Sequence, residues 1–214
     1  MKDLAFTRNL AWKLNWWRQS ELEGALLLGR MVRAAETAEF AARLTRHCAE
    51  EAEHSRIWAV VLAELGLPHV VIARSYQSFF LRHSGPPASI LEVLCFTQVF
   101  ERRVHTRFTQ ELRDARTPEP ARLAYRRMIE DEKDHLAWVA DWLRGQPDAG
   151  PGLVRYREID HAVFEELLPW EEQLWDLPGL GREIGEAPPH LCEAGCRGSA
   201  SCPRPCEQTR KTNP

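Results

Sequence analysis

The sequence predicts an all-α protein built around a bundle of four long helices. Three observations predict it. Four segments repeat apolar residues at steps of three or four, which places them on one face of a helix. A long connection, residues 66–88, separates the second segment from the third. The segments on either side of it carry glutamates and a histidine at matched spacing. The chain is therefore expected to form two helical hairpins.

The first helix is expected from near Leu4 to about Ala35, with one charge in its inner row. That row is Leu10, Leu14, Trp17, Glu21, Ala25, Leu28 and Val32. Ser20-x-x-Glu23 also fits a capping box, which would start the helix at Ser20 and make Glu23 a cap. The unbroken row upstream favours one helix with Glu21 on its inner face.

The second helix is expected to start after a Thr37 cap and to end at Leu65, before a glycine and a proline. Its inner row is Leu44, Cys48, Glu51, His54, Trp58 and Leu62. The connection that follows holds the apolar piece SYQSFFL and ends in Gly-Pro-Pro. It is long enough to cross between two hairpins.

The third helix is expected from about Ala88 to Arg116. The fourth helix should start after Thr117-Pro118, where threonine is the cap and proline the first helical residue, and should end at Gly145. The inner row of the third is Leu91, Leu94, Gln98, Glu101, His105, Phe108 and Leu112, and that of the fourth is Leu123, Met128, Glu132, His135, Val139 and Trp142. Residues 153–176 are expected to form a fifth helix or a helix pair, broken near Pro169. We expect a bundle over residues 1–177 and a Pro/Gly/Cys-rich tail over 178–214.

The inner rows bring two Glu-x-x-His motifs into the bundle, at residues 51–54 and 132–135. A carboxylate and an imidazole three positions apart lie on one helical face. Each motif has a glutamate upstream, 30 residues before Glu51 (51 − 21) and 31 before Glu132 (132 − 101). The candidate metal ligands are Glu21, Glu51, His54, Glu101, Glu132 and His135.

Four carboxylates in apolar rows would repel one another unless cations lay between them. Two divalent ions would balance their charge, and two iron or manganese ions are bound by such a set in helical bundles. Carboxylate and imidazole donors suit iron or manganese, and they leave zinc open. The alternative is that Glu51 and Glu132 form ordinary surface pairs with nearby arginine and lysine.

The repeated motif with its upstream glutamate resembles the ferritin-like diiron-carboxylate superfamily, over roughly residues 8–145. That superfamily includes ferritins, rubrerythrins, ribonucleotide reductase small subunits and small oxygenases such as the tRNA-modifying diiron hydroxylase. The resemblance implies a ferritin-like four-helix bundle with a long crossover between the hairpins. It also implies Glu51 and Glu101 as bridging ligands.

The same resemblance suggests residues that hold the ligands in place. Asp131 would orient His54 and Glu50 would orient His135, each by a hydrogen bond to the distal ring nitrogen. Glu50 departs from the usual aspartate, and solvated surface carboxylates are the alternative. For His105, one turn after Glu101, three roles stay open: a third nitrogen ligand, a hydrogen-bond donor to a ligand, or a core residue.

The tail holds four of the six cysteines, Cys192, Cys196, Cys202 and Cys206. They are a candidate zinc or iron site separate from the bundle. A bundle followed by four cysteines resembles rubrerythrin, whose second domain holds one iron in paired Cys-x-x-Cys loops. Here three residues separate the cysteines of each pair, and only five residues separate the two pairs. The basic residues of the tail leave contact with an acidic or RNA partner as an alternative.

The composition of the 214-residue chain is that of an ordinary globular protein. Its net charge of −3 and pI of about 6.3 do not favour nucleic acid as a partner. No apolar run approaches the roughly 20 residues that span a bilayer, and the N-terminus lacks a signal-peptide pattern. We expect a cytoplasmic monomer or dimer without membrane contact.

The sequence thus predicts a dimetal oxidoreductase, and iron is the expected metal. It would activate dioxygen to oxidise or hydroxylate an organic substrate, with electrons from a donor protein. A ferroxidase or a rubrerythrin-like peroxidase that uses peroxide is the alternative. A helical interaction module without metals is a third hypothesis.

Overall fold

The computed structural model describes residues 4–72 and 75–174, and all regular structure in these residues is helical. The helices are α1 (Leu4–Met31), the 3₁₀ helix η1 (Val32–Ala34), α2 (Ala38–Glu64), α3 (Tyr76–Ser84), α4 (Ile90–Arg113), α5 (Glu119–Arg144) and α6 (Ala149–Leu174). Across the described part of the chain, no helix combines the length and apolar character that a membrane span requires.

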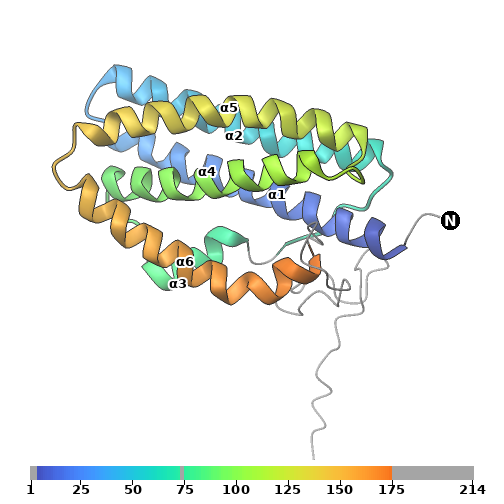
Figure 1. Ribbon diagram of the computed structural model, residues 1–214. Coiled ribbons are helices and arrows are strands. Elements are labelled where there is room, and N and C mark those ends of the chain that lie inside the picture. Colours follow the sequence, from blue (N-terminus) through green and yellow to red (C-terminus); the bar gives the residue numbers. More distant parts are fainter. Residues whose placement is uncertain (1–3, 73–74, 175–214) are drawn as a thin grey trace, which may run out of the picture.

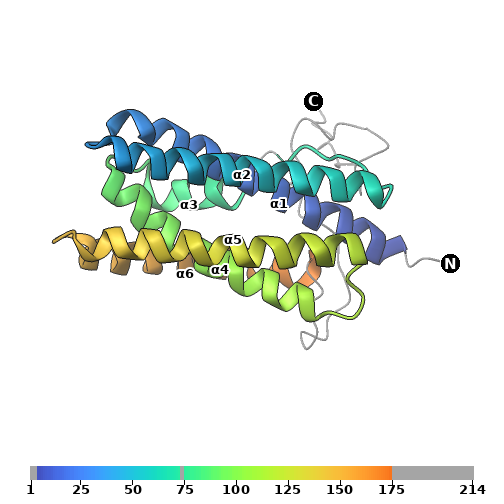
Figure 2. The same cartoon turned by 90° about the horizontal axis from the view of Figure 1, so that it is seen from above.

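The four long helices α1, α2, α4 and α5 lie lengthwise beside one another as a bundle (Figures 1 and 2). α1 packs along α2 and α4 packs along α5, and each pair runs antiparallel. α2 and α4 run in the same direction, because the connection between them returns along the bundle through α3. α3 and α6 cover the side of α1 and α4 that faces away from α2 and α5.

Hydroxyl side chains cap three of the helices, namely Thr37 for α2, Ser75 for α3 and Ser89 for α4. Thr37 Oγ1 accepts a hydrogen bond from the Phe40 amide at 3.1 Å at the start of α2, as predicted. Ser89 Oγ accepts one from the Glu92 amide at 3.2 Å. This bond fixes the start of α4 at Ile90 rather than at about Ala88.

Several helix ends differ from the prediction. Thr117 is not the N-cap of α5, because its hydroxyl donates to the Glu111 carbonyl at 2.7 Å and Pro118 takes the cap position. α4 accordingly ends at Arg113. α1 ends at Met31 and is followed by the 3₁₀ turn, short of Ala35.

α6 begins at Ala149, before the predicted start at residue 153, and is not broken at Pro169. Pro151 lies in the first turn, where a helix needs no amide donor. Pro169 removes one backbone hydrogen bond from the helix, which here does not end it.

An aromatic layer closes one side of the bundle interior, with one ring from each long helix. Trp17 of α1 meets Phe108 of α4 edge-on, with ring centroids 4.9 Å apart. Trp58 of α2 meets Tyr125 of α5 at 4.8 Å. Phe108 and Tyr125 lie 5.2 Å apart and join the two pairs. These contacts tie the two hairpins together next to the glutamates of the inner rows.

Of the predicted inner rows, Leu123 lies off the buried face and Cys48 lies only partly on it. Leu123 is 57% exposed, because the buried side of α5 passes through Ala124 and Tyr125 instead. Cys48 is half-buried, and its thiol donates to the Ala25 carbonyl at 3.2 Å. In both helices the predicted buried face differs from the observed one by a small rotation about the helix axis.

Candidate metal centre

The six candidate ligands predicted from the sequence converge in the bundle interior, and each is at most 6% exposed. They form two groups whose ligand-type atoms all lie within 4.8 Å of one another. The first group is His47, Glu51, Glu101 and His135, and the second is Glu21, Glu51, His54 and Glu132. Glu51 is common to both groups, whereas Glu101, expected from the resemblance as a second bridge, belongs to one.

His47 is a member of the cluster that sequence reasoning missed. It lies on α2, one turn before Glu51, and is 1% exposed. Its Nε2 is 2.9 Å from Glu101 Oε1 and 3.3 Å from Glu51 Oε1. The signal was present as His-x-x-x-Glu, which is also a same-face spacing. It was missed because the inner row was traced through Cys48.

The two motif histidines are oriented by carboxylates outside the cluster. His54 Nε2 lies 3.1 Å from Asp131 Oδ2, and His135 Nε2 lies 3.0 Å from Glu50 Oε2. These are the contacts expected for Asp131 and Glu50. With a proton on Nε2 donated to the carboxylate, Nδ1 is free to act as a ligand. His135 Nδ1 then faces Glu51 Oε1 at 3.2 Å.

Many polar atoms of the cluster are buried without a hydrogen bond of normal geometry, although some of them lie within 3.3 Å of one another. Burial of such atoms is costly unless another partner satisfies them. The atoms are Glu21 Oε1, Glu51 Oε1, His54 Nδ1, Glu101 Oε2, Glu132 Oε2, His135 Nδ1 and both ring nitrogens of His47. They converge on the two groups, and carboxylate oxygen and imidazole nitrogen are metal donors. The residues therefore fit divalent cations.

The pKa values of the cluster residues show which charges bound metals would have to balance. Burial raises the pKa of Glu132 to about 8, and burial with repulsion from Glu51 raises the pKa of Glu21 well above its usual range. Burial alone would lower the pKa of His47 and of His135, but nearby carboxylates raise these values to about 9 and about 12. Protons therefore balance the carboxylates when metal is absent.

The structure also shows which of the alternative candidate residues belong to the cluster. Glu21 is 3% exposed and belongs to the cluster. Glu23 points elsewhere, because it accepts hydrogen bonds from the Ser75 hydroxyl and from Gln19 Nε2. His105 is half-buried and belongs to neither group.

Gly24 has no side chain, and the carboxylate of Glu51 occupies the space beside it. It lies on α1 near Glu21, and a Cβ atom at this position would be 3.0 Å from Glu51 Oε2. That separation is shorter than an ordinary van der Waals contact. A glycine here lets the α1 backbone approach the carboxylate that both groups share.

A cavity of about 430 Å³ reaches the cluster between α2 and α5. His47, His135 and Glu50 line its inner part, and Trp138 is an aromatic neighbour whose ring lies 5.6 Å from that of His47. Arg43 and Arg46 also line it. The cavity gives a small molecule a route to two of the candidate ligands.

Comparison with protein-family models, with curated proteins and with solved structures finds no match for this chain. The assignment of the centre therefore depends on its own residues. Cys192, Cys196, Cys202 and Cys206, with the whole segment 178–214, lie outside the described residues.

Proposed function

We propose that the chain is a dimetal oxidoreductase of the ferritin-like kind, with two iron ions, that uses dioxygen to oxidise or hydroxylate an organic substrate. One observation carries the proposal. Four buried glutamates and three buried histidines converge, and their inward-facing atoms include many that lack any hydrogen-bond partner in the described part of the chain.

Each of the two groups would hold one ion, and Glu51 would bridge them. Two divalent ions bring four positive charges to the four carboxylates, so the filled centre would be close to neutral. Histidine and carboxylate donors without thiolate suit iron, and manganese is bound by the same kinds of donor. Two ferrous ions would supply the electrons with which dioxygen is activated.

The residues around the ions would set their geometry. Asp131 and Glu50 would hold the Nε2 protons of His54 and His135, which keeps both Nδ1 atoms aimed at the ions. The Trp17, Trp58, Phe108 and Tyr125 layer would keep water from one side of the centre. The cavity between α2 and α5 would give a substrate access to the centre.

That cavity favours oxidation of a bound substrate over iron storage. At about 430 Å³ it is within the usual size range of small-molecule sites. Trp138 would provide an apolar wall and His47 would lie between the substrate and the ions. An electron-donor protein would return the centre to its reduced state after each turnover.

The test is metal content per chain, followed by optical spectra after anaerobic ferrous loading and exposure to oxygen. We expect about two iron ions per chain and a transient that requires oxygen. Glu132→Ala should lose most of the metal and keep its helical circular dichroism. Glu130→Ala is the matched control, because Glu130 is exposed on the same helix and pairs with Lys133.

Two results would contradict the proposal. One is a wild-type protein that binds neither iron nor manganese under these conditions. The other is a Glu132→Ala variant whose metal content equals that of Glu130→Ala, since this would show that the ions lie elsewhere.

A further inference from the structure

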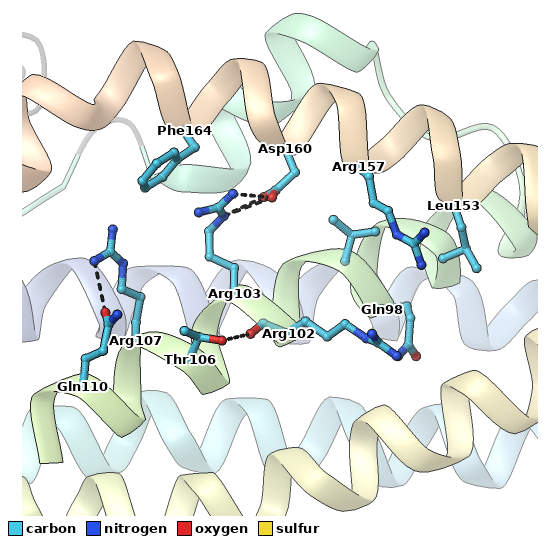
Figure 3. Close-up of a pocket in the computed structure, with 11 residues that line it drawn as sticks. Gln98, Arg102, Arg103, Thr106, Arg107, Gln110, Leu153, Arg157, Asp160 and Phe164 are labelled. Atoms are coloured by element: carbon cyan, nitrogen blue, oxygen red, sulfur yellow. Dashed lines mark hydrogen bonds and ion pairs between the residues drawn. The ribbon is translucent and has the colours of Figure 1, made fainter. Parts of the chain in front are cut away.

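A second cavity, of about 380 Å³, lies on the opposite side of α4 from the metal centre, between α4 and α6 (Figure 3). α4 contributes a face that carries Arg102, Arg103 and Arg107, and α6 contributes Arg157, Asp160 and other residues across from it. The proposed oxidoreductase function uses none of these side chains.

The lining of this cavity is strongly basic. It holds four arginines and a single carboxylate, that of Asp160. The chain as a whole has a net charge of −3, so the basic character is local. Figure 3 shows guanidinium groups reaching into the space from both helices. Positive charges gathered in a concave site create a field that attracts anions.

The carboxylate of Asp160 is bound by Arg103 and by Tyr76. Its Oδ1 accepts a hydrogen bond from the Tyr76 hydroxyl at 2.6 Å. Both its oxygens accept from Arg103 Nε, at 2.9 and 3.1 Å. The arrangement fixes Arg103 in place between α3, α4 and α6.

Phe164 holds two of the guanidinium groups near each other. Arg103 and Arg107 lie 4.4 and 5.6 Å from the centre of its ring. Burial and the charge of Arg103 lower the pKa of Arg107 to about 10. Two cations so close together in a partly buried position are stabilised when an anion joins them.

We propose that this cavity binds the phosphate group of a small organic molecule of about nucleotide size. Guanidinium groups donate paired hydrogen bonds that match phosphate oxygens. Gln98 and Gln110 add amide groups, and Phe164, Val99 and Leu153 add apolar surface for the rest of the molecule. The bounded volume and the acidic chain favour a small molecule over a nucleic-acid strand, which would need a long basic track.

The test is isothermal titration of the full chain with AMP, pyrophosphate and adenosine. We expect saturable binding of AMP and pyrophosphate that weakens as salt is added, and no binding of adenosine. The double variant Arg102→Gln/Arg157→Gln should bind AMP about tenfold more weakly or worse, because it removes two charge-assisted contacts. Both residues are exposed, so the fold should persist.

Two control variants make the result specific. Arg126→Gln removes an exposed arginine of α5, far from the cavity, and should bind AMP as the wild type does. Glu132→Ala should also keep AMP binding, so that this inference and the proposed function can fail separately.

Any of three outcomes would overturn the proposal. The first is no saturable binding of AMP or pyrophosphate. The second is equal AMP affinity of the double variant and of Arg126→Gln. The third is tight binding of a 20-nucleotide single-stranded RNA that AMP does not displace, which would indicate a nucleic-acid surface instead.

Discussion

A single methyl group at Gly24 should disturb the candidate centre. The added Cβ would lie 3.0 Å from Glu51 Oε2, so Gly24→Ala should displace the carboxylate common to both groups and reduce bound iron to well below that of the wild type. The helix itself should gain about 0.5–1 kcal/mol from alanine. Metal analysis and thermal unfolding would show loss of metal without loss of the apo fold.

Gly29→Ala is the matched control for Gly24→Ala. It makes the same change on the same helix, but its Cβ meets Cys48 Sγ, at 3.2 Å, rather than a candidate ligand. Its iron content should equal that of the wild type. Equal iron content in both variants would show that Glu51 does not bind metal as proposed.

Metal binding at neutral pH should release protons. The pKa of Glu132 is about 8 and those of His47 and His135 are about 9 and 12, so these groups hold protons at pH 7 in the apo protein. Ligands must lose them to bind metal. Apparent affinity should therefore fall as pH falls, and fewer protons should be released at pH 9 than at pH 7.

Calorimetric titration with ferrous or manganous ion in two buffers of different ionisation enthalpy measures that release. We expect about three protons per pair of ions at pH 7, one each from Glu132, His47 and His135. Identical heats in the two buffers would mean that no proton leaves, and that the raised pKa values do not belong to metal ligands.

The sequence identified six members of the cluster because each repeats at a matched position in the two hairpins. His47 has no counterpart in the second motif, where position 128 is Met128, so a search for repetition could not find it. Its role depends on the rotation of α2, which decides that His47 rather than Cys48 faces inward. From the spacing of apolar residues alone, the inward-facing residue of α2 can be assigned only to within about one position.

At the scale of elements, one buried ion pair joins α1 to α4. Lys13 Nζ lies 2.6 Å from Glu111 Oε2, with the side chains 6% and 2% exposed. Lys13→Met would leave a buried carboxylate without its main counter-charge, which should lower the free energy of unfolding by about 3–5 kcal/mol at pH 8. The double variant Lys13→Met/Glu111→Leu should recover most of the loss.

The loss should depend on pH with a definite sign. Burial raises the pKa of Glu111 in the folded protein, so its protonated form is favoured by folding and its ionised form becomes costly as pH rises through that value. Without Lys13 this cost grows. Urea unfolding should therefore show a smaller difference between Lys13→Met and wild type at pH 5.5 than at pH 8. An equal difference at both values would refute the account.

Helix ends were predicted less well than helix positions, for a local reason. Thr117-Pro118 fits a capping signal, yet the Thr117 hydroxyl is used by the Glu111 carbonyl at the end of α4. A short sequence cannot show which of two adjacent helices a side chain will serve. The all-helical architecture was predicted correctly because the apolar spacing of the inner rows extends over many turns.

At the scale of the whole molecule, metal binding at the candidate centre should be coupled to folding. The cluster joins α1, α2, α4 and α5, and many of its inward atoms lack hydrogen-bond partners in the described residues. Ions that bind only the folded bundle stabilise it by mass action, by about 2.7 kcal/mol at a free concentration 100 times the dissociation constant. For a chain of this length that corresponds to about 5–10 °C in Tm.

Differential scanning calorimetry of the full chain, with and without manganous ion under the same buffer, measures this coupling. Wild type and Glu130→Ala should both show the rise in Tm, and Glu132→Ala should lose most of it. Apo Glu132→Ala should unfold at or above the Tm of the apo wild type, because a buried carboxyl group with an unsatisfied oxygen is gone. A rise of equal size in all three proteins would place the stabilising ions outside the bundle and separate the fold from the centre.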